Sequence, residues 1–293
     1  MPLLAMVCAA LLWSTAGLFI KIMSLDPVSL AGWRSAVAVV ALMAFARQRG
    51  VRPGVPRDVQ AWIAVFSYAG IMFLFVCATR LTTAANAIFL QYTAPIYVLM
   101  LEPLLLKTRF RIQDAGYVGL ALAGMSLFFV GRLDAGDQLG NALALGSGIC
   151  FALFALLLRA KHDDDAGRWQ SIIYGNGLLA LAVALYFALS PATATWPHTP
   201  LEAGALLFLG TVQIGVAYVL FTFAIGRLSA LEATLIGMLE PVLNPVWVYL
   251  GTGERPSAWA LIGATLIITA IATRTVRMQR ADRLEPAGTG RSA

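Results

Sequence analysis

Long apolar runs separated by short polar segments make up most of the chain. A helix needs roughly 20 apolar residues to cross a bilayer. Runs near that length predict ten spans, at residues 3–22, 28–46, 60–79, 84–106, 113–131, 139–158, 169–189, 201–225, 230–250 and 256–273. The connections are short and leave no room for a soluble domain, and the polar, basic stretch 274–293 is expected to be a disordered tail.

The composition agrees with a protein that lies in a lipid bilayer. Of 293 residues, 59% are hydrophobic and only 12% are charged, which is too apolar for a soluble domain that covers its own core. The sequence therefore predicts an all-α integral membrane protein. Cys8, Cys77 and Cys150 lie singly in apolar runs, without the paired spacing of a metal site or a redox motif.

The basic residues indicate how the chain is oriented. The net charge of +6 comes from short clusters between apolar runs and from the tail, a distribution that sets membrane topology and does not indicate nucleic-acid binding. Most of the 21 lysines and arginines fall in alternate connections, and the opposite side holds only Lys21, Arg80, Arg132 and Arg255. Because basic loops stay in the cytoplasm, we expect both termini to be cytoplasmic in a multi-pass protein of the bacterial inner membrane.

Two parts of the chain resemble each other. The stretch "TAANAIFLQYTAPIYVLMLEPLLLKTR" at 83–109 aligns without gaps with "SALEATLIGMLEPVLNPVWVYLGTGER" at 229–255, and "LLWSTAGLFIK" at 11–21 aligns with "ICFALFALLLR" at 149–159. Each half has an odd number of spans, so the second half enters the membrane from the opposite side. The pattern predicts two inverted five-helix repeats, residues 1–133 and 134–273, an architecture typical of alternating-access carriers.

The ninth expected span carries polar groups near its centre. In "GMLEPVLNPVW" at 237–247, Glu240 and Asn244 lie at the depth where an unpaired charge is most costly. They share one helical face with Ala233, Gly237 and Trp247, which favours a polar wall facing a cavity. The alternative is that Glu240 is neutral, or paired with a neighbouring helix, and only holds the bundle together. Arg34 in span two is a possible counter-ion, but it is equally consistent with a structural or snorkelling role.

Three prolines are candidates for hinges. Pro241 and Pro245 follow the polar groups of span nine, and Pro95 occupies the position in span four that aligns with Pro241. A proline lacks the N–H that a helix requires and clashes with the preceding turn. We therefore expect spans four and nine to be kinked and to face each other.

Several motifs resemble the drug/metabolite transporter superfamily, and within it the ten-span EamA-type carriers. They are "LLWSTAG" in span one, the arginine of "LAGWRSAVA" in span two, the proline of "TAPIYVL" in span four, and "LEPVLNPVW" followed by "GTGERPSAWALIGATLI" in the second half. The resemblance covers almost the whole chain. One departure is that "LKTRF" places Thr108 where the family usually has glutamate, so that only Glu254 keeps its Gly-Glu pair.

The family arrangement implies that spans one, three, four, six, eight and nine line a central cavity. Its apolar wall would then be formed by Trp13, Phe151 and Phe154. The polar substrate contacts would come from Ser14, Tyr68, Gln91, Tyr92, Gln213, Glu240 and Asn244. The family's substrates include amino acids, other metabolites and drugs, and aromatic amino-acid exporters of the YddG type are similar carriers.

These patterns favour a secondary transporter that exports small metabolites, most of all amino acids. The chain has no Walker-type segment, so ATP is not the direct drive, and Glu240 either couples transport to protons or only contacts the substrate. An alternative with the same fold is a multidrug or cationic-compound exporter. An intramembrane lipid-modifying enzyme is disfavoured, since His162 and His198 both lie outside the spans. No cofactor is expected, and no metal is expected at "KHDDDAGR", residues 161–168.

Overall fold

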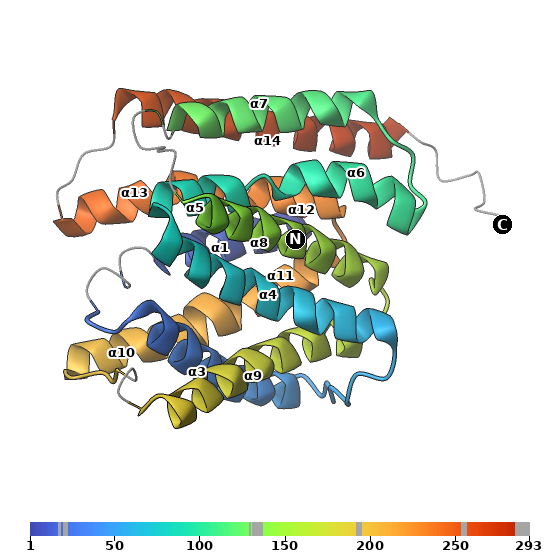
Figure 1. Cartoon of the computed structure of the whole chain (residues 1–293). Coiled ribbons are helices and arrows are strands. Elements are labelled where there is room, and N and C mark those ends of the chain that lie inside the picture. Colours follow the sequence, from blue (N-terminus) through green and yellow to red (C-terminus); the bar gives the residue numbers. More distant parts are fainter. Residues whose placement is uncertain are drawn as a thin grey trace.

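The computed structural model describes residues 1–16, 19, 23–128, 130, 137–191, 195–252 and 257–284. Every regular element among them is helical (Figure 1). The first part of the chain forms α1 (Pro2–Ser14), α3 (Pro27–Gln48), α4 (Val59–Leu81), α5 (Ala84–Gln91), α6 (Ala94–Leu106) and α7 (Ile112–Phe128). The second part forms α8 (Gln138–Ala160), α9 (Asp165–Leu189), α10 (Pro200–Phe208), η2 (Leu209–Val216), α11 (Ala217–Ile225), α12 (Ala230–Gly237), α13 (Leu239–Thr252) and α14 (Ala258–Leu284).

The membrane character of the helices is confirmed. Within the described residues, 8 helical stretches are long and apolar enough to cross a bilayer, and each coincides with one of the expected spans. The first and fifth expected spans fall on α1, which has 13 residues, and on α7, which has 17. Residues outside the described ranges follow α1 after residue 16 and α7 after residue 128, so the full set of ten spans stays a prediction.

Polar residues mark where several of these helices begin. Asp26 caps α3 by accepting hydrogen bonds from the backbone N–H groups of Val28 and Ser29. Asp58 caps α4 through the N–H of Ala61, and Asp137 caps α8 through Gly140. A side-chain acceptor at this position satisfies N–H groups that have no partner inside the helix. Short polar segments therefore separate the apolar runs and also start the next helix.

The helices form a layered bundle in which partners come from distant parts of the chain. In Figure 1, α7 and α14 lie side by side as an outer layer, while α3, α9 and α10 lie on the far side of the central helices. The main packed pairs are α4 with α8, α1 with α11, α4 with α9, α3 with η2, α5 with α8, α6 with α8, α1 with α13, α3 with α9, and α7 with α14.

One end of the bundle carries most of the basic connections. Residues 49–58, 107–111 and 161–164 connect helices at the right-hand end in Figure 1, and these connections contain most of the loop arginines and lysines. We call this the basic end. The connection at 82–83 and the described residues 190–191 and 195–199 lie at the other end, which we call the opposite end.

Two of the apolar segments are interrupted near their centres. α5 ends at Gln91 and α6 begins at Ala94, just before Pro95. α12 ends at Gly237 and α13 begins at Leu239, just before Pro241. At the first interruption α8 packs closely, because a Cβ on Gly148 would stand 2.8 Å from the carbonyl oxygen of Gln91. Glycine at this position lets α8 lie against the exposed end of α5.

The last helix differs from the sequence-based expectation. α14 continues to Leu284, so the first part of the stretch expected to be a disordered tail, residues 274–284, is helical. Arg274 is almost fully buried, and its Nε donates a hydrogen bond to Asp114 Oδ1 of α7 at 2.8 Å. This buried ion pair ties the end of α14 to α7. Residues 285–293 lie outside the described part of the chain.

Candidate functional site

A cavity of about 190 Å³ lies between the central helices. Its wall is formed by α1, α3, α4, α5, α8, η2, α11 and α13, through Trp13, Ala16, Arg34, Ile71, Met72, Phe75, Ile88, Gln91, Tyr92, Phe151, Gln213, Ile214, Tyr218, Glu240 and Pro241. Of the binding residues expected from the sequence, those on this wall are Trp13, Gln91, Tyr92, Phe151, Gln213 and Glu240. The first half and the second half of the chain both contribute.

The two interrupted segments meet at the cavity. Tyr92 follows the end of α5, and Glu240 stands in the first turn of α13. The Tyr92 hydroxyl donates a hydrogen bond of 2.5 Å to Glu240 Oε2. A hydrogen bond to an ionised acceptor is shorter and stronger than one between neutral groups. The helix breaks therefore bring a carboxylate and its donor together across the two halves of the chain.

Gln91 is positioned by a different contact. Its Nε2 donates to Ser147 Oγ at 2.8 Å, and the Ser147 hydroxyl in turn donates to the backbone oxygen of Ile71 at 2.9 Å. This chain of hydrogen bonds joins α5, α8 and α4. Gln91 lies on the cavity wall, but its amide nitrogen is already committed to the neighbouring helix.

Other expected binding residues lie behind the wall. Ser14 Oγ accepts a hydrogen bond from Trp247 Nε1 at 2.8 Å, and the Tyr68 hydroxyl accepts one from Asn176 Nδ2 at 2.9 Å. Phe154 is fully buried. These side chains support the groups that face the cavity. The backbone of Asn244 belongs to α13, but its side chain lies outside what the structure describes.

The expected hinge prolines differ in their positions. Pro241 lies on the cavity wall, and Pro95 is buried in the first turn of α6. Pro245 lies inside α13, which continues past it to Thr252. Only Pro95 and Pro241 therefore stand directly after an interruption of the helix.

Span eight contains a feature that the sequence did not reveal. Leu209–Val216 forms a π-helix between α10 and α11, and it carries Gln213 onto the cavity wall. Such widened turns occur often at functional sites. A glycine marks the segment, because a Cβ on Gly210 would stand 2.5 Å from Val37, but close packing alone does not distinguish a π-helix from an α-helix.

Arg34 was recognised from the sequence as an intramembrane charge but was not assigned to the binding site. The structure places it on the cavity wall. Its Nη2 lies 3.3 Å from Met72 Sδ, and its Nε is buried without a hydrogen-bond partner in the described part of the chain. The same is true of Trp13 Nε1 and Gln213 Oε1 on the same wall. The cavity therefore presents polar groups whose hydrogen-bonding capacity is unused by the described residues.

An aromatic cluster closes the cavity toward the basic end. The rings of Tyr68 and Tyr218 have centroids 5.0 Å apart, Tyr68 and Phe154 are 5.2 Å apart, and Trp13 lies 5.4 Å from Phe221. Aromatic pairs at such distances pack with favourable electrostatics. The cavity itself extends the other way, since Arg34 lies early in α3 and Phe75 lies late in α4, both nearer the opposite end.

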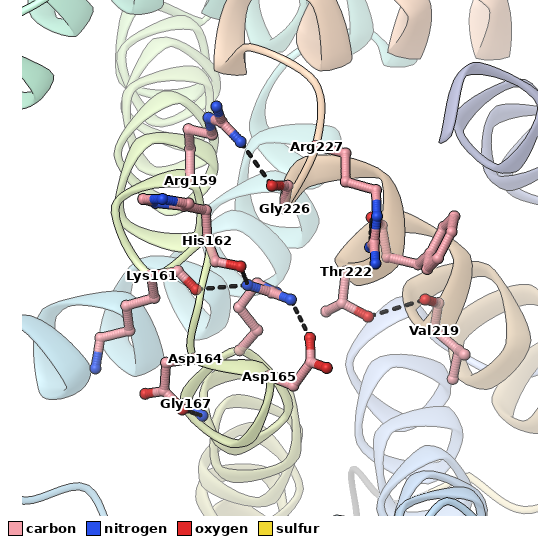
Figure 2. A network of polar contacts seen from close by, with 12 residues as sticks. Arg159, Lys161, His162, Asp164, Asp165, Gly167, Val219, Thr222, Gly226 and Arg227 are labelled. Carbon is pink, nitrogen blue, oxygen red and sulfur yellow. Dashed lines mark hydrogen bonds and ion pairs between the residues drawn. The ribbon is translucent and has the colours of Figure 1, made fainter. Parts of the chain in front are cut away.

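A polar network closes the basic end beyond the aromatic cluster. Figure 2 shows Arg159 of α8 donating to the backbone oxygen of Gly226, which follows α11, at 2.7 Å. Arg168, only 2% exposed, donates to the backbone oxygens of Lys161 and His162 and pairs with Asp165. Asp164 caps α9 through the N–H of Gly167. The acidic residues of this loop therefore cap a helix and pair with arginine.

Comparisons with known proteins agree with this architecture. The model of the EamA-like transporter family matches residues 1–130 and again residues 138–275. A solved structure described only as a crystal structure of a protein superposes with a TM-score of 0.82 at 21% identity, over 98% of this chain and 99% of the other. It supports the fold alone.

Curated relatives cover most of the chain. An uncharacterized transporter of Archaeoglobus fulgidus is 25% identical over 91% of this chain and 93% of its own length. The uncharacterized transporter YwfM of Bacillus subtilis is 28% identical over 75% of this chain and 76% of its own. The threonine/homoserine exporter RhtA of Escherichia coli is 25% identical over 84% of this chain and 81% of its own. The family matches span both halves of the chain, and this protein, a membrane transporter and not an enzyme, therefore belongs to the EamA-like transporter family.

Proposed function

We propose that this chain exports small neutral amino acids across the bacterial inner membrane by alternating access, with the cavity as the substrate site. The observation that carries the proposal is the meeting of two interrupted helices at the cavity, where Tyr92 donates to Glu240. In secondary transporters, discontinuous helices commonly form the substrate site near the bilayer midplane. The membership in a transporter family supports the same function.

The size and polarity of the cavity favour a small polar substrate. Pockets for drug-sized ligands measure roughly 300–1,000 Å³, whereas this cavity measures about 190 Å³. Its wall carries a carboxylate, a guanidinium and two amides among apolar side chains. An amino acid of the size of threonine or homoserine, the substrates in the name of the relative RhtA, suits such a site better than a large drug.

The inverted repeat is part of the proposal, because it supplies a second conformation. Among the packed helices, α4 with α8 corresponds to α11 with α1, α4 with α9 to η2 with α3, and α6 with α8 to α13 with α1. Each correspondence replaces a helix by the one five expected spans along the chain. The two matches of one family model, at 1–130 and 138–275, give independent support. Exchange of equivalent contacts between the repeats would open the basic end and close the other.

We further propose that the basic end faces the cytoplasm, with both chain termini inside. Basic connections are retained on the cytoplasmic side. The cavity, which extends toward the opposite end, then faces the periplasm. A cysteine introduced at Arg49 or Arg280, both exposed, should react with a membrane-impermeant thiol reagent only from the cytoplasmic side. Labelling from outside intact cells would reverse this orientation.

Flux through purified protein in liposomes tests the proposed function. The panel consists of labelled threonine, homoserine, phenylalanine and tryptophan together with a cationic dye, each with and without a pH gradient. We expect saturable flux of the small amino acids. If a pH gradient accelerates this flux, the result supports proton coupling through Glu240. If the flux does not depend on the gradient, the result supports facilitated diffusion.

Two controls make the result interpretable. Empty liposomes report leakage, and liposomes with the Glu240→Gln protein report flux that does not depend on the site. Flux of the dye without flux of any amino acid would contradict the proposal and favour an exporter of cationic compounds. Preferential flux of phenylalanine and tryptophan would keep the mechanism and correct the substrate class.

A further inference from the structure

The two charged groups on the cavity wall differ in how well they are satisfied. Glu240 has a strong donor in the Tyr92 hydroxyl at 2.5 Å. Among the described residues, Arg34 makes one hydrogen bond, from Nη2 to the thioether sulfur of Met72 at 3.3 Å. A thioether is a weak acceptor, and a guanidinium carries five N–H donors. Within the described part of the chain, most of the hydrogen-bonding capacity of Arg34 is therefore unused.

Burying a charged arginine with so few hydrogen bonds costs free energy unless another group binds the guanidinium. A charged group within the membrane-spanning part of a protein normally pairs with another group or marks a substrate path. Arg34 and Glu240 interact electrostatically, but they form no ion pair in the part of the chain that the structure describes. Within the described residues, the guanidinium stands on the wall of the cavity without an anionic partner.

Two further buried groups on the same cavity wall also lack hydrogen-bond partners among the residues that the structure describes. Trp13 Nε1 is a donor, Gln213 Oε1 is an acceptor, and both side chains are only 6% exposed and line the same cavity. Buried polar groups are almost always hydrogen-bonded, so a cluster of unpaired ones facing a cavity indicates a ligand. Unused donors at Arg34 and Trp13 call for an anionic group, while Gln213 and Glu240 call for a cationic or donating one.

We propose that Arg34 binds the carboxylate of the transported substrate, and that Glu240 with Gln213 binds its ammonium group. This inference rests on the proposed function and narrows it to substrates that carry both charges. A planar guanidinium matches a carboxylate with two parallel hydrogen bonds, and a lysine ammonium does not reproduce that geometry. The carrier should therefore select free α-amino acids over amines, amino alcohols and amino-acid esters.

The selectivity of the unmodified protein is the first test. Liposomes that contain the purified protein are loaded with unlabelled threonine, and the counterflow of labelled threonine into them is measured. Unlabelled threonine, threonine methyl ester or threoninol is added outside as a competitor. Because a hydrogen bond to a charged group contributes substantially, we expect threonine to compete about tenfold to a hundredfold more strongly than either analogue. This measurement does not depend on the folding of any variant.

Two variants of Arg34 assign the selectivity to this residue. Arg34→Gln should reduce threonine counterflow about tenfold, to a rate still above the background of empty liposomes, and remove most of the preference over threonine methyl ester. Arg34→Lys should keep the charge but recover only part of that preference. The exposed Arg227, whose guanidinium lies 4.1 Å from the ring centroid of Phe223, provides a matched control, since Arg227→Gln should leave both flux and selectivity unchanged.

The outcomes separate this inference from the function on which it rests. Threonine flux with equally strong competition by the ester and the amino alcohol would overturn the role of Arg34 and leave amino-acid export intact. Dye flux that is unaffected by Arg34→Gln, without any amino-acid flux, would overturn both. Loss of selectivity in Arg34→Gln, with retained size-exclusion profile and thermal stability, would support both.

Discussion

The two interrupted segments, α5–α6 and α12–α13, share a backbone pattern but carry different chemistry. When Pro95 is aligned with Pro241, the helix break falls at the same place in both. In the alignment, Glu240 stands opposite Ala94, and Tyr92 stands opposite Met238. One segment therefore supplies an acid and the other supplies its hydrogen-bond donor. The comparison indicates that proline sets where the chain bends, while single side chains make the two bends unequal and complementary.

The largest effect on flux is expected from substitution of Glu240, the carboxylate that α12–α13, and not α5–α6, contributes to the cavity wall. Glu240→Gln keeps the shape but removes the charge, so flux of threonine should fall by about tenfold or more, as expected for loss of an interaction with an ionised group. Any pH dependence of flux between about pH 5 and 8 that arises from ionisation of Glu240 should disappear. The measurement is initial-rate flux in liposomes across that range.

A carboxylate in the other interrupted segment provides the control. Glu102 of α6 accepts a hydrogen bond from the backbone N–H of Ala230, at 3.3 Å, at the start of α12, and it does not line the cavity. Glu102→Gln should therefore change flux much less than Glu240→Gln. Equal losses in the two variants would show that both acids only hold the bundle together.

The next effect concerns the donor that α5–α6 contributes. Tyr92→Phe removes one hydroxyl and keeps the ring, so Glu240 loses its 2.5 Å hydrogen bond while the wall stays in place. We expect a several-fold increase in the KM for threonine with a smaller change in maximal rate, because the carboxylate is no longer held in position. A variant with unchanged KM and unchanged rate would contradict a functional role for the pair.

The helix interruptions after Gln91 and Gly237 are expected to affect the rate of substrate exchange more than the affinity for threonine. Proline is about 3 kcal/mol less favourable than alanine inside a helix, so Pro241→Ala and Pro95→Ala lower the cost of a continuous helix. Both should slow exchange several-fold with little change in threonine binding, and Pro241→Ala should have the larger effect because Pro241 lines the cavity. Pro103→Ala, at a proline inside α6 and away from the break, is the control. Faster exchange in the first two variants would argue against hinges.

The smallest effect is expected at Gln91, whose amide already bonds to Ser147. Gln91→Ala and Ser147→Ala should each lower the free energy of unfolding by about 1 kcal/mol, the usual net contribution of a hydrogen bond. If the loss of this one hydrogen bond destabilises both single variants, the double variant should be more stable than the sum of the two single effects predicts. Thermal unfolding in detergent measures this coupling, and strict additivity would show that Gln91 acts independently of Ser147.

The parts of the structure that the sequence revealed are those that depend on local chemistry. Apolar runs set the spans, and aspartates such as Asp26 and Asp58 start helices where the runs begin. Pro95 and Pro241 coincide with the breaks because proline cannot sustain the hydrogen bonds of a helix interior. Glu240 was found for a similar reason, since a carboxylate in an apolar span is rare enough to stand out.

The remaining features depend on how distant helices meet, and a single sequence does not contain that information directly. The 2.5 Å contact between Tyr92 and Glu240 joins residues far apart in the chain. The π-helix at Leu209–Val216 exists in a segment whose composition also fits an ordinary α-helix. Ser14 and Phe154 were expected to face the substrate, but periodicity does not distinguish the wall of a cavity from the layer behind it.

The central claim is that the substrate site lies between the two interrupted helices and opens toward the opposite end. Measuring whether a thiol reagent reaches the cavity wall from that end tests this claim most directly. In a protein whose three cysteines, Cys8, Cys77 and Cys150, are replaced by alanine, Phe75→Cys is placed on the cavity wall and Trp196→Cys on the connection at the opposite end, where Trp196 is 56% exposed. A membrane-impermeant thiol reagent should label both cysteines from the periplasmic side, and threonine should slow the labelling of Phe75→Cys without affecting that of Trp196→Cys. Labelling of Phe75→Cys only from the cytoplasmic side, or at a rate that threonine does not change, would contradict the proposed site.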